Sequence, residues 1–454
     1  MLLKDAIEEI SGLRHVVDRL ELHSGVAKRW LYDSPYLGTG EEIQRELALI
    51  DAVMPLGRWP EVTSPMSRVK DIRGTIHRLA AGEVPDDIEL FEIKVFALLA
   101  GEISGAMREA GVAVVQVPAL EAVVDILDPD KSRLPRFYIH DSYSPELARL
   151  RARLHDVTGS ASGDEGLAGQ LFAGCMAEED RVRERLAALL RVYHEALSGA
   201  IVAIARLDIL LAKARLSGEM GGCRPGVSTG VTRYEGLFHP RVREVLRGRG
   251  REFQPVTIAF GEEACLITGA NMGGKSVLLK SLALSQALFQ FGFHVPAARA
   301  EIAPVEALLL SIGDEQDEER GISSFASEML RLDRIVREVK GGKQVLVLMD
   351  EPARGTNPTE GIAIVNAIVE FLSLHRTRSL ITTHYSGIRV PCRKLRVKGF
   401  RDTGESLSLC DLPGRMDYSL VEEEQERVPR EAVRVAEMLG VDAEMIETIK
   451  HYIS

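Results

Sequence analysis

The stretch LITGANMGGKSVL, residues 266–278, decides the fold of this chain. It joins a short apolar strand to a helical pattern, and between them lies the spacing GxxxxGK[ST] at residues 269–276. Glycines in such a loop let backbone N–H groups point at phosphate oxygens, and the N-terminus of the following helix adds positive potential. The stretch therefore predicts a nucleotide-binding α/β domain.

The loop assigns a first set of residues to ATP and Mg²⁺. We expect Lys275 to reach the β- and γ-phosphates and Ser276 to ligate Mg²⁺. The predicted nucleotide-binding residues of the loop are Gly269, Ala270, Asn271, Met272, Gly273, Gly274, Lys275, Ser276 and Val277.

A second apolar strand, VLVLMDE at residues 345–351, ends in two carboxylates. Asp350 is predicted to bind Mg²⁺ through its hydration shell, and Glu351 to position or deprotonate the attacking water. His384 follows the strand SLITT, residues 379–383, where a histidine can hydrogen-bond the γ-phosphate. Lys275, Glu351 and His384 are thus the predicted catalytic residues.

Composition narrows the class of protein. The chain has 454 residues, which is enough for two to four domains because single cores stop growing near roughly 250 residues. Its net charge of −11 is unfavourable for a protein that grips a DNA duplex. Five cysteines without paired spacing indicate neither disulfides nor a zinc site. With no signal sequence and no long apolar run, we expect a soluble, cytoplasmic protein.

Hydrophobic periodicity divides the chain into four predicted regions. Residues 1–160 are mostly helical, with short strands at 112–117 and 136–141, and residues 161–228 hold long helices and a linker. Residues 229–415 alternate strand, loop and helix, as in a mostly parallel sheet. Residues 416–454 form a helical pair, 429–439 and 442–452. The helical run 167–217 is interpreted as one rigid arm, and the alternative is a folded-back pair with Gly199 at the turn.

Five blocks, taken in order, resemble the ATPase domain of the MutS family, which has an ABC-type P-loop fold. They are TGANMGGKS (268–276), GFHVPAARAEI (292–302), GISSFASEM (321–329), MDEPARGTNPTEG (349–361) and TTHY (382–385). Ala270 departs from the family pattern, which has proline there. Upstream, residues 74–94 resemble the family's core domain and residues 205–216 its returning lever helix.

The resemblance implies a dimer, because in such ATPases the signature segment of one subunit completes the ATP site of the other. The partner is a second copy or a related chain. By the same resemblance, Ser323 contacts the γ-phosphate of the partner's nucleotide and Asn357 crosses the interface. Phe253 is a candidate for stacking on adenine, and the alternative is a core aromatic at the start of a strand. The C-terminal helical pair resembles the family's dimerising element.

MutS proteins that read mismatches also carry a Phe-x-Glu wedge, a connector domain and a clamp. The Phe-x-Glu found here, Phe260-Gly-Glu262, lies just before the strand of the phosphate loop and does not fit a wedge. Residues 160–217 leave little room for a clamp, and we expect no nuclease-type C-terminal domain. We therefore expect the modules that read DNA to be absent.

Three functions remain open. LPRFYIHDSYSPEL (134–147) and the block around residues 350–361 resemble the ATPase subunit of reactivases for adenosylcobalamin-dependent lysine aminomutases. That resemblance favours an ATPase that remodels a protein client, such as a cobalamin-dependent aminomutase. The alternative is a mismatch-repair or recombination ATPase that binds mismatched, damaged or branched DNA. The third is a nucleotide sensor with little turnover, which the presence of Glu351 opposes.

Overall fold

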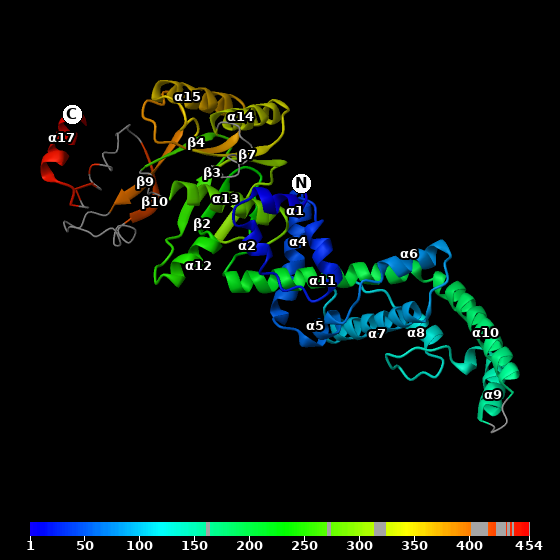
Figure 1. Cartoon of the computed structure of the whole chain (residues 1–454). Coiled ribbons are helices and arrows are strands. Elements are labelled where there is room, and N and C mark those ends of the chain that lie inside the picture. Colours follow the sequence, from blue (N-terminus) through cyan, green and yellow to red (C-terminus); the bar gives the residue numbers. More distant parts are fainter. Residues whose placement is uncertain are drawn as a thin grey trace. The chain divides into compact units, whose positions relative to one another are not determined.

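The computed structural model describes residues 1–159, 164–269, 274–312, 324–400, 416–423, 433, 436–437 and 440–453. The chain forms two compact units, and neither is one continuous stretch (Figure 1). The first comprises Met1–Leu20, Ser34–Ala48 and Leu216–Ser454, and the second Glu21–Asp33 and Leu49–Arg215. The domain limits predicted at residues 160, 228 and 415 are not those of the compact units and stay a prediction.

The first unit is mixed α/β. Its strands are β1 (Gly226–Val227), β2 (Thr232–Leu237), β3 (Val256–Phe260), β4 (Ala264–Thr268), β5 (Arg299–Ile302), β6 (Ala307–Ser311), β7 (Val345–Asp350), β8 (Arg378–Thr382), β9 (Arg393–Phe400) and β10 (Met416–Glu422). Its helices include α1 (Leu3–Glu9), α2 (Leu13–Val17), α12 (Pro240–Gly248), α13 (Lys275–Gln290), α14 (Ser324–Lys340), α15 (Pro358–Leu374) and α17 (Ala443–Ile453). The helix α17 matches the predicted 442–452, and most of the predicted helix 429–439 lies outside the described residues. The region 416–454 is not a helical pair alone, because it begins with β10, which pairs with β9.

A six-stranded sheet carries the phosphate loop, in the order β10-β9-β4-β8-β7-β6. All its pairings are parallel except that of the edge strand β10 with β9. Strands β4, β7 and β8 are almost entirely buried, as expected when helices cover both faces of a parallel sheet. The prediction of a mostly parallel sheet is confirmed.

Alternation along the strands divides the core between the two faces of that sheet. Val345, Val347 and Met349 pack with buried residues of α14 and α15, including Ile335 and Val365. Figure 1 shows α14 and α15 on this face and α13 on the other. A second sheet, β1-β5-β2-β3, belongs to the same unit. Phe260 ends β3 and is 1% exposed, which agrees with the prediction that it is no DNA wedge.

Helices are the regular elements of the second unit among its described residues. Its elements are α3 (Gly25–Tyr32), the end of α4 (Gly40–Val53), the 3₁₀ helix η1 (Met54–Leu56), α5 (Pro60–Ser67), α6 (Arg73–Ala81), α7 (Asp87–Glu109), α8 (Glu121–Leu127), the 3₁₀ helix η2 (Asp141–Tyr143), α9 (Pro145–Gly159), α10 (Glu165–Arg191) and most of α11 (His194–Met220). A capping box starts α7, because Asp86 Oδ1 accepts from Glu89 N at 2.8 Å and Glu89 Oε2 from Asp86 N at 3.1 Å.

The strands predicted at 112–117 and 136–141 are wrong, because neither segment pairs with another strand. Side chains bond part of the second segment's backbone instead. Lys94 Nζ donates to the carbonyl of Arg136 at 2.9 Å, and an Arg151 guanidinium nitrogen donates to that of Ile139 at 2.8 Å. Hydrogen-bonding groups that a sheet would have used are thus satisfied without one.

The single rigid arm predicted at 167–217 is also wrong. The run divides into α10 and α11 at Val192–Tyr193, and α9 packs along α10 (Figure 1). Gly199 is not a turn, since it lies inside α11. A Cβ at that position would be 3.3 Å from Cγ of Pro118, so the glycine permits close packing. Among the described residues, no helix has both the length and the apolar character needed to span a bilayer.

Candidate nucleotide-binding site

Two glycines flank the phosphate loop in the left-handed region of backbone space. Gly269 has φ 125° after β4, and Gly274 has φ 69° at the N-cap of α13. A Cβ on Gly269 would be 3.2 Å from that of Val397, and one on Gly274 would be 3.1 Å from Cδ1 of Tyr418. Both glycines are therefore required by conformation and by space. The predicted loop residues Ala270, Asn271, Met272 and Gly273 lie outside the described residues.

Lys275 is the first residue of α13, and its side chain is only 3% exposed. Its ammonium group donates to the carbonyl of Gly269 at 2.6 Å and lies 3.5 Å from Oε1 of Glu351. Ser276 is exposed next to it, and Val277 is half-buried. The lysine predicted from the loop and the acid predicted from a distant strand are thus brought together.

The two acids differ in how the sheet holds them. Asp350 ends β7 opposite Thr382 of β8, and its Oδ1 accepts a hydrogen bond from the Thr382 hydroxyl at 2.6 Å. The backbone N–H of Glu351 in turn donates to that hydroxyl at 2.9 Å. Thr382 is fully buried, so one hydroxyl fixes both residues of the acid pair at the carboxyl end of the parallel strands.

Glu351 lies at the centre of a charged group. Its carboxylate is 12% exposed, and its Oε2 lies 3.8 Å from Nδ1 of His384 and 3.4 Å from the guanidinium of Arg354. The His384 side chain is 38% exposed, and its ring lies 4.4 Å from that of Tyr385 between centroids. The three predicted catalytic residues, Lys275, Glu351 and His384, therefore form one cluster.

The turn after Glu351 is held by residues that the sequence analysis did not single out. Ala353, at φ 63°, donates its N–H to Oε1 of Glu328 at 2.7 Å, and its carbonyl accepts from the Tyr385 hydroxyl at 2.8 Å. Burial raises the pKa of Glu328, and it also raises the pKa of Tyr385. Both residues belong to motif blocks of the sequence, Glu328 to residues 321–329 and Tyr385 to residues 382–385. Their contacts with Ala353 depend on the folded chain and cannot be predicted from the motifs.

The remaining predicted residues lie apart from that cluster or outside the description. Asn357 is exposed and caps its own helix, because its Oδ1 accepts from Glu360 N at 3.0 Å. Phe253 is half-buried in the segment before β3. Ser323 lies outside the described residues.

Tyr418 is an aromatic residue beside the loop that the sequence analysis missed. Its ring borders Gly274, and its backbone N–H donates to Oε1 of Gln254 at 3.2 Å. The Gln254 side-chain amide also donates to Oδ1 of Asp417 at 2.9 Å. These bonds tie the segment that carries Phe253 to β10. The only available signal was the strand pattern of MDYSLVE, which does not reveal its neighbours.

The donor set matches a magnesium–nucleotide complex. A buried ammonium group and a helix N-terminus suit the phosphates, and carboxylate and hydroxyl oxygens are the ligands that Mg²⁺ prefers. A second carboxylate lies within the same cluster, where a water next to the terminal phosphate would need a base. Of the predicted metal ligands, Asp350 ends β7 and Ser276 opens α13.

Comparison with known proteins finds sequences similar to the part of the chain that carries this site. Residues 265–453 match the family described as MutS domain V. An Endonuclease MutS2 from Caldanaerobacter subterraneus subsp. tengcongensis is 32% identical over 283 residues, which cover 61% of this chain and 34% of that protein. A DNA mismatch repair protein MutS from Rhodopseudomonas palustris is 32% identical over 323 residues, covering 67% of this chain and 32% of its own length.

A more extended match is to an Endonuclease MutS2 from Geobacillus thermodenitrificans. It is 27% identical over 401 residues, which cover 72% of this chain and 50% of that protein. The chain therefore spans 32% to 50% of the length of these three relatives.

Proposed function

We propose that this chain is a magnesium-dependent ATPase of the MutS family, because residues 265–453 match that family's domain V. The observation that carries the proposal is the convergence of Lys275, Glu351 and His384 beside Asp350 at the carboxyl ends of parallel strands. The reaction is hydrolysis of ATP to ADP and phosphate.

Each residue has a defined role in the proposed reaction. Lys275 neutralises the β- and γ-phosphates, and Glu351 orients the attacking water and accepts its proton. His384 donates a hydrogen bond to the γ-phosphate. Ser276 and Asp350 would hold Mg²⁺, whose charge would offset the negative charge that develops on the phosphates. Thr382 and the bonds around Ala353 keep the acids in position.

Adenine is proposed to lie beside β10. Tyr418 borders the end of the phosphate loop, and the Gln254 bonds bring the segment that carries Phe253 to the same strand. Two aromatic residues are thus available for stacking on a planar base.

The proposed assembly is a dimer with composite sites, formed by two copies or with a related chain. Ser323 of one subunit completes the partner's nucleotide site, and Asn357 contributes across the interface. The exposure of Asn357 supports this role, since a residue that crosses an interface must reach the surface of its own subunit.

The client of the ATPase is proposed to be DNA. The relatives named above are called a DNA mismatch repair protein and endonucleases of the MutS2 type, and these names favour the DNA reading over the cobalamin reactivase. The ABC-type arrangement of the two ATP sites is part of the same proposal.

The ATPase proposal is tested with Glu351→Gln. Loss of a general base typically slows a reaction by about 10²–10⁴-fold, so hydrolysis should fall by that factor while nucleotide binding persists. Glu370→Gln is the matched control, because Glu370 is exposed on α15. Equal turnover in the two variants would refute the role of Glu351. A Lys275→Ala protein that binds and hydrolyses ATP normally would refute the site.

The client is tested by filter binding at low salt, where phosphate contacts are strongest. Duplex, mismatched and branched DNA are compared with and without ATP. The DNA proposal predicts binding that weakens as salt rises, and no binding to any of the three would overturn it. A purified adenosylcobalamin-dependent aminomutase tests the reactivase alternative, for which ATP-dependent release of cobalamin is the expected signal.

A further inference from the structure

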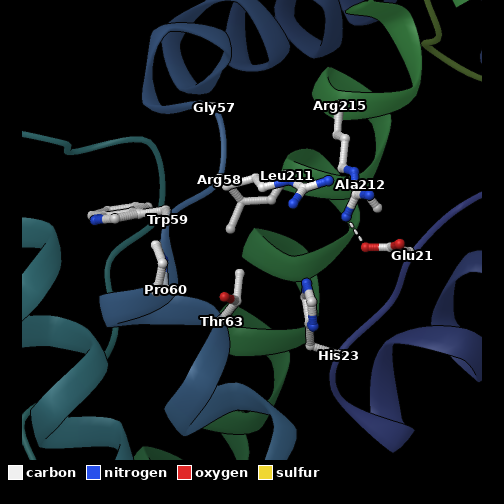
Figure 2. Close-up of a pocket in the computed structure, with 10 residues that line it drawn as sticks. All are labelled: Glu21, His23, Gly57, Arg58, Trp59, Pro60, Thr63, Leu211, Ala212 and Arg215. Carbon is white, nitrogen blue, oxygen red and sulfur yellow. Dashed lines mark ion pairs between the residues drawn. The ribbon is translucent and has the colours of Figure 1, made fainter. Parts of the chain in front are cut away.

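The second unit contains a cavity of ≈ 240 Å³ that the ATPase proposal does not use. Figure 2 shows the residues that line it, which come from the segment before α3, the η1–α5 connection and α11. The residues that matter for its chemistry are Glu21, His23, Arg58, Trp59, Thr63 and Arg215.

Positive charge exceeds negative charge in this cavity. Arg215 forms an ion pair with Glu21 (dashed in Figure 2), which leaves the charge of Arg58 unmatched among the lining residues. Arg58 has no ion pair or side-chain hydrogen bond within the described part of the chain. In Figure 2 its guanidinium group points toward that of Arg215. Two converging guanidinium groups with one carboxylate suit an anion.

Two further features of α5 border the same cavity. The helix α5 begins at Pro60, next to the cavity, and its N-terminus has no side-chain cap. That end of a helix carries positive potential. The half-buried hydroxyl of Thr63, in the first turn of α5, is a further donor.

The walls of the cavity are held in place. The backbone N–H of His23 donates to both carboxylate oxygens of Asp208, at 3.1 and 3.0 Å, and Asp208 is fully buried on α11. Trp59 borders the cavity and is only 8% exposed, and in Figure 2 its ring points away from the two arginines. Gly57, at φ 57°, forms the turn that presents Arg58 and Trp59.

We propose that this cavity binds a phosphate group of a small ligand, with Arg58 and Arg215 as its principal contacts. The volume is far larger than the roughly 10–15 Å³ that a single water needs, so it admits a phosphate with a short organic portion. The inference is independent of the ATPase proposal, because none of these residues belongs to the nucleotide site.

Two sources supply this chemistry, a free small phosphate and the backbone of a nucleic acid, and the cavity size favours the first. The test uses Trp59 as the reporter. The chain has two tryptophans, so Trp30→Phe leaves Trp59 as the single emitter. A Lys275→Ala background removes phosphate binding at the nucleotide loop. Emission is titrated with inorganic phosphate, glycerol 3-phosphate and a single-stranded oligonucleotide.

We expect a saturable change of Trp59 emission with glycerol 3-phosphate. Arg58→Ala should weaken binding about tenfold or more, as loss of a charge-assisted hydrogen bond does. Arg149→Ala is the control, because Arg149 is exposed on α9 and pairs with Glu146. Glu21→Gln should tighten binding, since it frees Arg215 from a competing carboxylate.

Three outcomes decide the matter. If no probe gives a saturable response, or if Arg58→Ala and Arg149→Ala bind equally, the site is overturned. Displacement of glycerol 3-phosphate by the oligonucleotide would keep the phosphate site and assign it to nucleic acid. If circular dichroism shows that Arg58→Ala misfolds, Arg58→Lys replaces it, and weaker binding is expected because lysine lacks the two-pronged guanidinium geometry.

Discussion

Replacing Thr382 with valine should loosen the positions of Asp350 and Glu351 without changing any residue proposed to contact the substrate. The buried hydroxyl donates to Asp350 at 2.6 Å and accepts from the N–H of Glu351 at 2.9 Å. The bond from the N–H of Glu351 has a substitute, since the same N–H also lies 3.2 Å from the Thr382 carbonyl oxygen. The bond to Asp350 has no substitute within the described part of the chain. A hydrogen bond to a charged group contributes about 1.5–3 kcal/mol, which is the expected total loss.

That loss is divided between folding and catalysis. Urea denaturation followed by circular dichroism measures the first part, and steady-state ATP hydrolysis at varied Mg²⁺ measures the second. We expect hydrolysis to fall about tenfold, with a higher Mg²⁺ requirement, because 1.4 kcal/mol corresponds to a factor of ten. Ser379→Ala is the control, since Ser379 is equally buried on β8 but its hydroxyl makes a single long bond among the described residues, at 3.3 Å. If the two variants are indistinguishable, Thr382 does not position the acids.

Three further predictions concern other contacts. Gly361→Ala should destabilise the protein by about 1–3 kcal/mol in urea denaturation, because its Cβ would lie 2.5 Å from Cζ of Tyr385, whereas Gly101→Ala, with open space on α7, should stabilise by about 0.5–1 kcal/mol. Glu328→Gln should hydrolyse ATP normally and be at least as stable as the parent at pH 7. Burial raises the pKa of Glu328, so its charged form destabilises the fold increasingly above pH 4.5. Glu328→Leu, which loses the acceptor for the N–H of Ala353, should hydrolyse ATP slowly. Burial lowers the pKa of His239 from 6.5 to about 4, so between these pH values only the unfolded chain binds this proton. The free energy of unfolding should therefore fall by up to about 1.4 kcal/mol per pH unit as pH drops from 6.5 to 4. His239→Asn should flatten that slope in denaturation measured across pH, and an unchanged slope would contradict the assignment.

The sequence predicts those parts of the site that are local. The phosphate loop, the acid pair and His384 each follow a strand, and strands of a parallel sheet deliver their next residues to one edge. Lys275 and Glu351 could therefore be expected to meet before any coordinates were known. Pairing across strands is different, because the register of Asp350 with Thr382 depends on the whole sheet.

The wrong predictions also concern structure that depends on distant residues. Residues 136–141 have the composition of a strand, yet a strand needs a partner, and Lys94 and Arg151 bond that backbone instead. Gly199 has the composition of a turn, but its lack of a side chain serves close packing against Pro118. In both cases a distant residue decided the local structure, and periodicity cannot report distant residues.

The backbone of Glu351 has a consequence for engineering. Its φ of 47° is a conformation that asparagine and glycine adopt readily and glutamate does not, and such positions cost on the order of 1 kcal/mol. The glutamate at this position therefore supports hydrolysis at a cost in folding stability. Laboratory selection for thermal stability alone should favour Asn at residue 351, and the more stable variants that result would not hydrolyse ATP.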